Sequence, residues 1–283
     1  MAKGNGIRRW LLCPEIGEAP LATVLAASQG GFTQRRLPTL AMVPTVDEIA
    51  ARIKRLMADY QGWVGQGDIS AHRPCPTVGC TCRFRHRHGY TPHFVVCGNW
   101  EVRVDLLRLL CPKCKATETL LPDWMRRYSP YPWPLQEAAV LHYVSGPAGY
   151  RPVASLFGVD YTVLWGWVRR LAAVAVELAG VVVRELLEQE PDAALDLEPI
   201  AAGAVLHKAR TEEKRLGLAH LPLLARGAEA LRVACRNRAE LPAGEAGGAL
   251  GWLSRYLPLH AVPSHLWIGS HRRSHSVLPP TPP

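Results

Sequence analysis

Two pairs of cysteines constrain the fold of this chain more than any other feature of its sequence. Cys75 and Cys80 form a C-x4-C pair, and Cys111 and Cys114 form a C-x2-C pair about thirty residues later. Turns of this kind present two sulfurs towards one point, and Zn²⁺ prefers four thiolates in a tetrahedron. Because four thiolates leave no open coordination position, the pattern predicts a structural zinc site in a zinc ribbon, with no catalytic role.

Three alternatives to this ligand set stay open. Cys82 could replace Cys80, since the first pair is more widely spaced than usual. His86 or His88 could also compete as ligands, and the cysteines could be ordinary buried thiols. The cysteines without a partner at ligand spacing are interpreted as small core residues, and they are Cys13, Cys97 and Cys235.

The hydrophobic pattern changes from strand-like to helical along the chain. Thr45 and Glu48 form a capping box before an amphipathic helix that runs to about Tyr60. Thr91–Cys97 and Trp100–Leu110 read as strands joined by a two-residue turn. Helical patterns follow over 135–144, 151–157, 161–190, 204–218, 221–238 and 246–257.

These patterns predict an α+β fold that is mostly α. A small zinc-ribbon β-hairpin domain precedes a helix-turn-helix unit of three helices and a helical C-terminal region. The predicted segments are 1–41, a poorly ordered N-terminus; 42–74, the amphipathic helix and a polar linker; 75–134, the zinc ribbon with an aromatic connector; 135–190, the helix-turn-helix with a long last helix; 191–274, the helical C-terminal region; and 275–283, a disordered tail.

The charge balance favours a polyanionic partner. Lys and Arg number 33 against 24 Asp and Glu, so the formal net charge is +9. Arg83, Arg85 and Arg87 alternate in the expected ribbon and could lie along a phosphate backbone. The other interpretation of this run is a solvated basic face of a strand.

Residues 150–170 match the pattern of a helix-turn-helix. Ala154 supplies the small residue where two helices cross, Gly158 suits the turn, and Asp160 suits the N-cap of the second helix. Either Val163 or Leu164 would face inward, together with Trp167. The residues left for an outward, DNA-reading face are Tyr161, Thr162, Trp165, Gly166, Arg169 and Arg170. The alternative is a generic helical hairpin, with Trp165 packed on a neighbouring element.

The order of these parts resembles a family of bacterial zinc-ribbon proteins of unknown function that are often labelled transposase-like. The resemblance is carried by the cysteine pairs, His88-Gly89-Tyr90, Leu120-Leu121-Pro122 and Trp167-Val168-Arg169-Arg170, over roughly residues 70–172. The chain is also similar to the N-terminal DNA-binding parts of insertion-sequence transposases. This resemblance implies a bacterial DNA-binding protein tied to mobile elements. The first cysteine spacing departs from the family pattern.

No catalytic constellation is recognisable in the sequence. An acidic-triad transposase needs two Asp and one Glu on an α/β core, whereas Asp192, Asp196 and Glu198 lie in a stretch rich in Pro and Ala. We therefore expect a sequence-specific binder of double-stranded DNA with structural Zn²⁺, acting in transcription regulation or beside a mobile element. The alternatives are a partial or degenerate transposase and a zinc-stabilised protein–protein adaptor.

Two further expectations concern location and assembly. The longest apolar run, Leu171–Val183, is short and contains Glu177, so no membrane span is expected. A cytoplasmic location follows as an expectation, and it agrees with cysteines used as metal ligands. The helices of the C-terminal region could form a homodimer or bind a partner protein.

Overall fold

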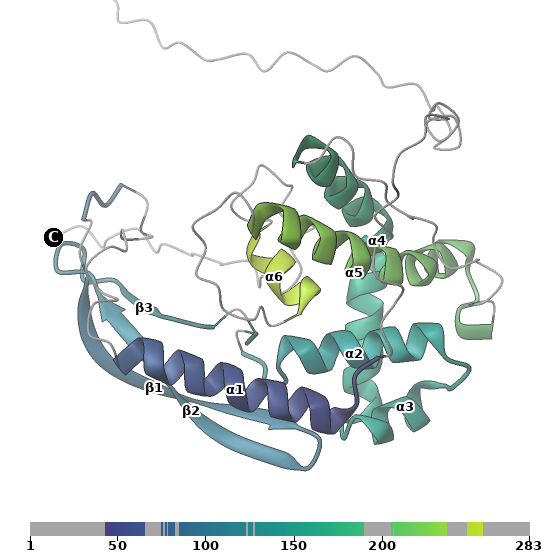
Figure 1. Cartoon of the computed structure of the whole chain (residues 1–283), viewed down its shortest axis with the longest axis horizontal. Helices are drawn as coiled ribbons and strands as arrows, with labels where there is room; N and C mark the ends of the chain where they lie inside the picture. Colours follow the sequence, from purple (N-terminus) through teal and green to yellow (C-terminus); the bar gives the residue numbers. More distant parts are fainter. Residues whose placement is uncertain are drawn as a thin grey trace, which may run out of the picture. The chain divides into compact units, whose positions relative to one another are not determined.

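The part of the chain that the structure describes is mostly helical and carries one small antiparallel sheet (Figure 1). The computed structural model describes residues 43–65, 75, 77, 79–82, 85–122, 124–126, 128–189, 205, 207–236 and 248–256. The elements are α1 (Val46–Gly65), β1 (His86–Cys97), β2 (Trp100–Leu110), β3 (Thr117–Thr119), α2 (Trp133–Ser145), α3 (Tyr150–Leu156), α4 (Tyr161–Gln189), α5 (Glu212–Arg236) and α6 (Ala249–Tyr256). The expectations for 1–41 and 275–283 lie outside the described residues.

The sheet has the strand order β1-β2-β3. The expected two-residue turn is confirmed, since Cys97 pairs with Trp100 across Gly98 and Asn99. β1 begins at His86, five residues earlier than expected, because a β-bulge after Arg87 lets the strand continue along β2. The short strand β3 was not expected from the sequence.

α1 begins at the predicted capping box and runs further than predicted. The backbone N–H of Thr45 donates to Glu48 at 2.7 Å, and the N–H of Glu48 donates to the Thr45 hydroxyl at 3.3 Å. The helix continues to Gly65, so the prediction of a linker from residue 61 is wrong over that last turn. The buried side chain of Val64 explains the extension, since the last turn still packs on the core.

One buried tyrosine connects α1 to the sheet. The Tyr60 hydroxyl donates to the carbonyl of Leu120 at 3.0 Å and accepts from the backbone N–H of Leu107 at 2.9 Å. Buried polar groups stabilise a fold when they are fully paired. Residues of α1, of the sheet and of all the later helices contribute to a single hydrophobic core.

The last helices differ from the sequence expectation at Pro222. Two helices, 204–218 and 221–238, were expected there, but α5 is one helix that contains Pro222. An interior proline removes one backbone hydrogen bond and its ring crowds the carbonyl of residue i−4, so other contacts must offset this cost. Leu218, Leu221 and Leu224 are buried around it, and packing of α5 along α4 maintains the helix through the proline.

The hairpin turn packs closely against the turn between α3 and α4. A Cβ placed on Gly158 would lie 2.6 Å from the Cα of Gly98, and Gly158 has a φ of 64°. Glycine meets both requirements, because it lacks a Cβ and adopts positive φ without strain. This contact fixes where α4 starts relative to the sheet.

None of the helices that the structure describes is long and apolar enough to cross a membrane.

Candidate metal centre and nucleic-acid interface

Four cysteine sulfurs gather at one end of the sheet. The Sγ atoms of Cys75 and Cys114 lie 3.5 Å apart, those of Cys80 and Cys111 lie 3.7 Å apart, and all four lie within 4.8 Å of one another. A tetrahedron with Zn–S bonds of about 2.3 Å has sulfurs about 3.8 Å apart. A disulfide would need about 2.05 Å. The cluster therefore has the dimensions of a four-thiolate metal site and can hold a metal ion.

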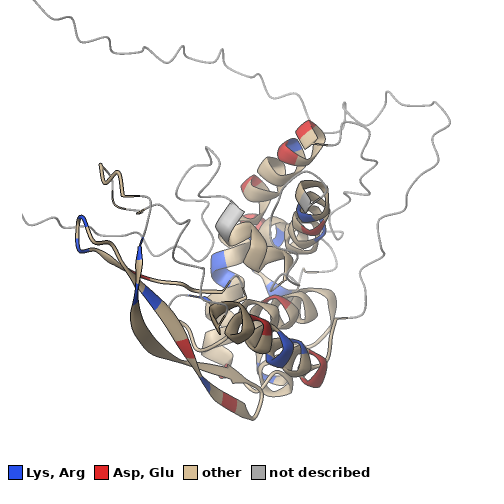
Figure 2. Cartoon of the chain, turned by 60° about the vertical axis from the view of Figure 1, so that its left-hand side comes forward, with Lys and Arg blue, Asp and Glu red and all other residues tan. Residues whose placement is uncertain are grey.

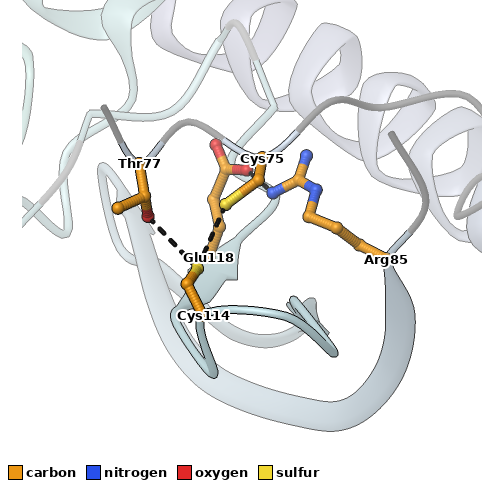
Figure 3. Close-up of polar contacts among 5 residues, drawn as sticks. All are labelled: Cys75, Thr77, Arg85, Cys114 and Glu118. Carbon is orange, nitrogen blue, oxygen red and sulfur yellow. Dashed lines mark hydrogen bonds and ion pairs between the residues drawn. The ribbon is translucent and has the colours of Figure 1, made fainter. Parts of the chain in front are cut away.

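Backbone turns position the two cysteine pairs. The backbone N–H of Cys80 donates to the carbonyl of Thr77 at 3.0 Å, and the backbone N–H of Cys75 donates to the carbonyl of Cys82 at 2.9 Å. The second pair follows β2, and the N–H of Cys111 donates to Ala116 at 2.9 Å. The Sγ of Cys114 lies 3.6 Å from the Thr77 hydroxyl oxygen, to which it donates as a thiol (Figure 3). The strand pairing thus brings together turns that lie about thirty residues apart in the sequence.

The polar contacts of Cys114 favour its charged form. The backbone N–H of Ala116 and the Thr77 hydroxyl lower the pKa of Cys114 to about 6. A thiolate is the form that binds a metal ion. Cys111 is buried and Cys114 is exposed, so the cluster has one side open to solvent.

The other candidate ligands lie outside the cluster. Cys82 contributes its carbonyl to the Cys75 turn, but its sulfur does not belong to the group of four. His86 and His88 are exposed on β1 and are not in that group either. Cys97 is buried in the core, whereas Cys13 lies outside the described residues.

Arg85 does not have the exposure that a phosphate contact requires. Its side chain is only 4% exposed and forms an ion pair with Glu118, beside the cysteine cluster (Figure 3). A buried cation needs a partner of this kind, because desolvation of an isolated charge is costly. The expectation that Arg85 contacts DNA is therefore corrected: this residue holds the strand start against β3.

The rest of the basic run gives little support to a phosphate-binding strand. Arg87 is exposed but donates to the carbonyl of Val64, at the C-terminal end of α1, where a cation is favourable. Arg83 lies outside the described residues. Along β2, Glu101, Arg103 and Asp105 alternate in sign, and Figure 2 shows both charges on the sheet. The sheet therefore lacks a uniformly basic face among the described residues.

The segment predicted as a helix-turn-helix folds as α3 and α4 with a turn at Gly158. Val153, Ala154 and Phe157 are buried, as the pattern requires. Asp160 caps α4, since its carboxylate accepts from the backbone N–H of Thr162 at 2.8 Å. This capping hydrogen bond lowers the pKa of Asp160, together with the bond from the Thr162 hydroxyl.

Apart from the half-buried Gly166, the residues expected on the outward face of α4 are exposed. We call this set the outward row, and it comprises Tyr161, Thr162, Trp165, Arg169 and Arg170. Leu164, Trp167 and Val168 point the other way and are buried. Trp165 is 47% exposed, so it does not pack into the core, and the Arg169 guanidinium lies 5.2 Å over its ring. The first three turns of α4 thus present two aromatic residues, Tyr161 and Trp165, followed by two arginines, Arg169 and Arg170.

Two arginines that the sequence reasoning did not single out lie beside the outward row. The guanidinium of Arg151 lies 5.4 Å over the ring of Tyr161. Arg126 lies over the Trp133 ring, and burial together with the nearby charge of Arg170 lowers the pKa of Arg126 to about 10. The sequence signal was limited to their charge, since Arg126 precedes α2 and Arg151 lies in α3, and their proximity to α4 depends on tertiary packing.

Comparisons of the chain with protein-family models, with curated proteins and with solved structures find no match.

Proposed function

We propose that this chain is a zinc-stabilised, sequence-specific DNA-binding protein that places the start of α4 in the major groove. The observation that carries the proposal is the outward row, in which every member is exposed while the opposite side of α4 is buried. A recognition helix reads base edges with its N-terminal residues and contacts phosphates with flanking arginines. The net charge of +9 agrees with a polyanionic partner.

The residues of the outward row take different roles in this proposal. Trp165 offers apolar surface for a thymine methyl group, and Arg169 and Arg170 contact phosphates. Arg126 adds a further cation beside Arg170, and a phosphate between them would relieve the repulsion of the two charges. The hydroxyl of Thr162 already donates to the Asp160 carboxylate. The proposal therefore assigns Thr162 an exposed place near the start of α4 and no hydrogen bond of its own to a base.

Zinc is the metal that the proposal assigns to the cysteine cluster. Four thiolates at tetrahedral spacing suit Zn²⁺, and such a site is structural because it has no open position. The family resemblance adds mobile-element DNA as the expected class of target. In this proposal zinc stabilises the sheet, and the DNA-reading surface lies on α4.

A salt titration of DNA binding tests the nucleic-acid part. Arg169→Ala should weaken binding to selected and random duplexes about equally and should lower the salt slope by about one unit, since one phosphate contact releases about one counterion. Trp165→Ala should instead reduce the preference between sequences. The matched control is Arg103→Ala, because Arg103 is exposed on β2 and already paired with Asp105 at 3.0 Å. Fluorescence anisotropy measures affinity and slope together.

The proposal fails if the full chain binds no duplex at low salt, which would favour the adaptor. It also fails if Arg169→Ala and Arg103→Ala have the same effect. Metal-dependent strand cleavage by the full chain would point to a partial transposase instead.

Metal analysis tests the zinc assignment separately. The purified chain should contain about one Zn²⁺, and Cys114→Ser should lose it because three thiolates leave the tetrahedron incomplete. Cys82→Ser is the matched control and should retain the metal, since its sulfur is outside the cluster. Equal zinc content in the two variants would contradict the assignment.

A further inference from the structure

The second half of α4 carries an exposed apolar stripe. Beyond Arg170, the face that holds the outward row continues with apolar or small residues spaced alternately by three and four, namely Ala173, Val176, Gly180, Val183 and Leu187. Val176 is 47% exposed and Leu187 is 43% exposed. A Cβ added at Gly180 would meet no atom within 4 Å. Nothing in the part of the chain that the structure describes therefore packs over the middle of this stripe.

The other side of the same helix is already used. Ala175, Leu178 and Val182 are buried, and α5 packs along α4. The stripe also differs from the outward row, because it contains no basic residue that could contact phosphate. An exposed apolar surface with this composition is typical of a protein–protein contact.

The spacing of the stripe indicates which kind of partner fits. Alternate steps of three and four residues give a period of 3.5, which is the spacing at which two helices pack side by side through knobs and holes. A small residue at the centre lets two helix backbones approach closely. We propose that the apolar stripe of α4 pairs with the same stripe of a second copy of this chain, in antiparallel orientation, across a two-fold axis.

The charges beside the stripe select the antiparallel orientation. Glu177 and Arg184 lie seven residues apart along one edge. In an antiparallel pair this edge meets the same edge of the second copy, so Glu177 faces the partner's Arg184 and Arg184 faces the partner's Glu177. Both contacts form at once because a two-fold interface is self-complementary. In a parallel pair this edge would face the opposite edge, which carries Ala172, Ala179 and Leu186 and no charge.

The same register places the apolar residues against one another. Val176 packs against the partner's Leu187, and Gly180 lies opposite the partner's Val183, which leaves room for the valine side chain. The stripe is about 21 Å long, since fourteen residue steps rise about 1.5 Å each. Because this is a small interface, we expect a reversible dimer that dissociates on dilution. The inference concerns self-association alone and does not depend on DNA binding.

Sedimentation velocity of the full chain over a concentration series, with zinc and without DNA, tests this pairing. The mass should rise from 31.2 kDa towards twice that value, and Val176→Glu should keep the chain monomeric. Val176 is exposed in the monomer, so this substitution should leave the fold intact. Val233→Glu is the matched control, because Val233 is 45% exposed on α5, outside the stripe. It should dimerise like the parent chain.

A charge exchange tests the orientation. E177R and R184E should each weaken the dimer at least several-fold, and the double variant E177R/R184E should restore it. The proposal is overturned if the parent chain stays monomeric at every concentration, or if Val233→Glu is as disruptive as Val176→Glu. It is also overturned if the double variant fails to restore the association, because the antiparallel register requires that rescue.

Discussion

At the scale of single residues, Glu137 of α2 is half-buried, and its carboxylate caps another helix. Its Oε2 accepts from the backbone N–H of Leu250, in the first turn of α6, at 2.9 Å. Burial raises the pKa of Glu137 to about 7, although the N–H groups of Leu250 and Ala249 oppose this shift. The folded chain therefore keeps a proton that the unfolded chain releases near pH 4.5.

Glu137→Gln tests this coupling. The contribution of Glu137 to stability is fully present below pH 4.5 and is lost as the pH rises to about 7, because over that range the unfolded chain releases the proton while the folded chain still holds it. Glutamine retains the acceptor oxygen without the charge. The excess of its free energy of unfolding over that of the parent should be small near pH 5 and should grow to about 1–3 kcal/mol at pH 8. Urea unfolding at both pH values, at constant zinc, measures the difference.

The control for this comparison is Glu101→Gln, which removes a carboxylate that is exposed on β2. It should show no pH-dependent gain. The burial argument would be contradicted if the free energy of unfolding of Glu137→Gln differed from that of the parent by the same amount at pH 5 and at pH 8.

Single residues were predictable from the sequence where their partners are local. Asp160 and Thr162 are two residues apart, and the exposure of the outward row follows from helical periodicity alone. Arg85 was not predictable in this way. Its partner Glu118 lies 33 residues later on β3, and its burial depends on how three strands come together. The cysteines are an intermediate case. Each pair has a short spacing typical of metal ligands, and that spacing indicates that the two distant pairs meet at one metal ion.

At the scale of elements, the turn between α3 and α4 is held by two glycines in contact. Gly158→Ala should lower the free energy of unfolding by roughly 2 kcal/mol or more, since alanine is strained at a φ of 64° and its Cβ would clash with Gly98. Thermal and urea unfolding followed by circular dichroism measure the loss.

Gly62→Ala is the comparison variant, and it should change the free energy of unfolding in the opposite direction. Gly62 lies inside α1, where a Cβ would meet no atom within 4 Å. Alanine should stabilise the helix there by up to about 1 kcal/mol. Similar destabilisation by both substitutions would mean that the contact between the two turns has no special role.

Element boundaries followed from the sequence wherever the local signal was complete. The capping box gave the start of α1, and Gly98-Asn99 gave the hairpin turn. The interior proline of α5 misled the prediction, because periodicity cannot show that burial against α4 outweighs one missing hydrogen bond. The strand β3 is too short to carry a pattern of its own and forms only because β2 offers an edge.

At the scale of the whole molecule, the sheet and the helices share one hydrophobic core. Removing the proposed zinc ion with a strong chelator should therefore lower the melting temperature of the whole unit, and the loss of stability should extend beyond the cysteine turns. Hydrogen exchange should show reduced protection in α2 and α5 as well as in β2. Zinc added back should restore it. Loss of protection confined to residues 75–120 would mean that the sheet unfolds independently.

The unbroken length of α4 has a geometric consequence. The outward row and the apolar stripe lie on one helix with 3.6 residues per turn, so their angular phase is fixed by the number of residues between them. One residue inserted between Leu171 and Ala173 would rotate the two surfaces relative to each other by about 100°, and four would bring them back to within about 40°. The direction in which a second copy extends is thereby coupled to the direction in which Trp165 and Arg169 point.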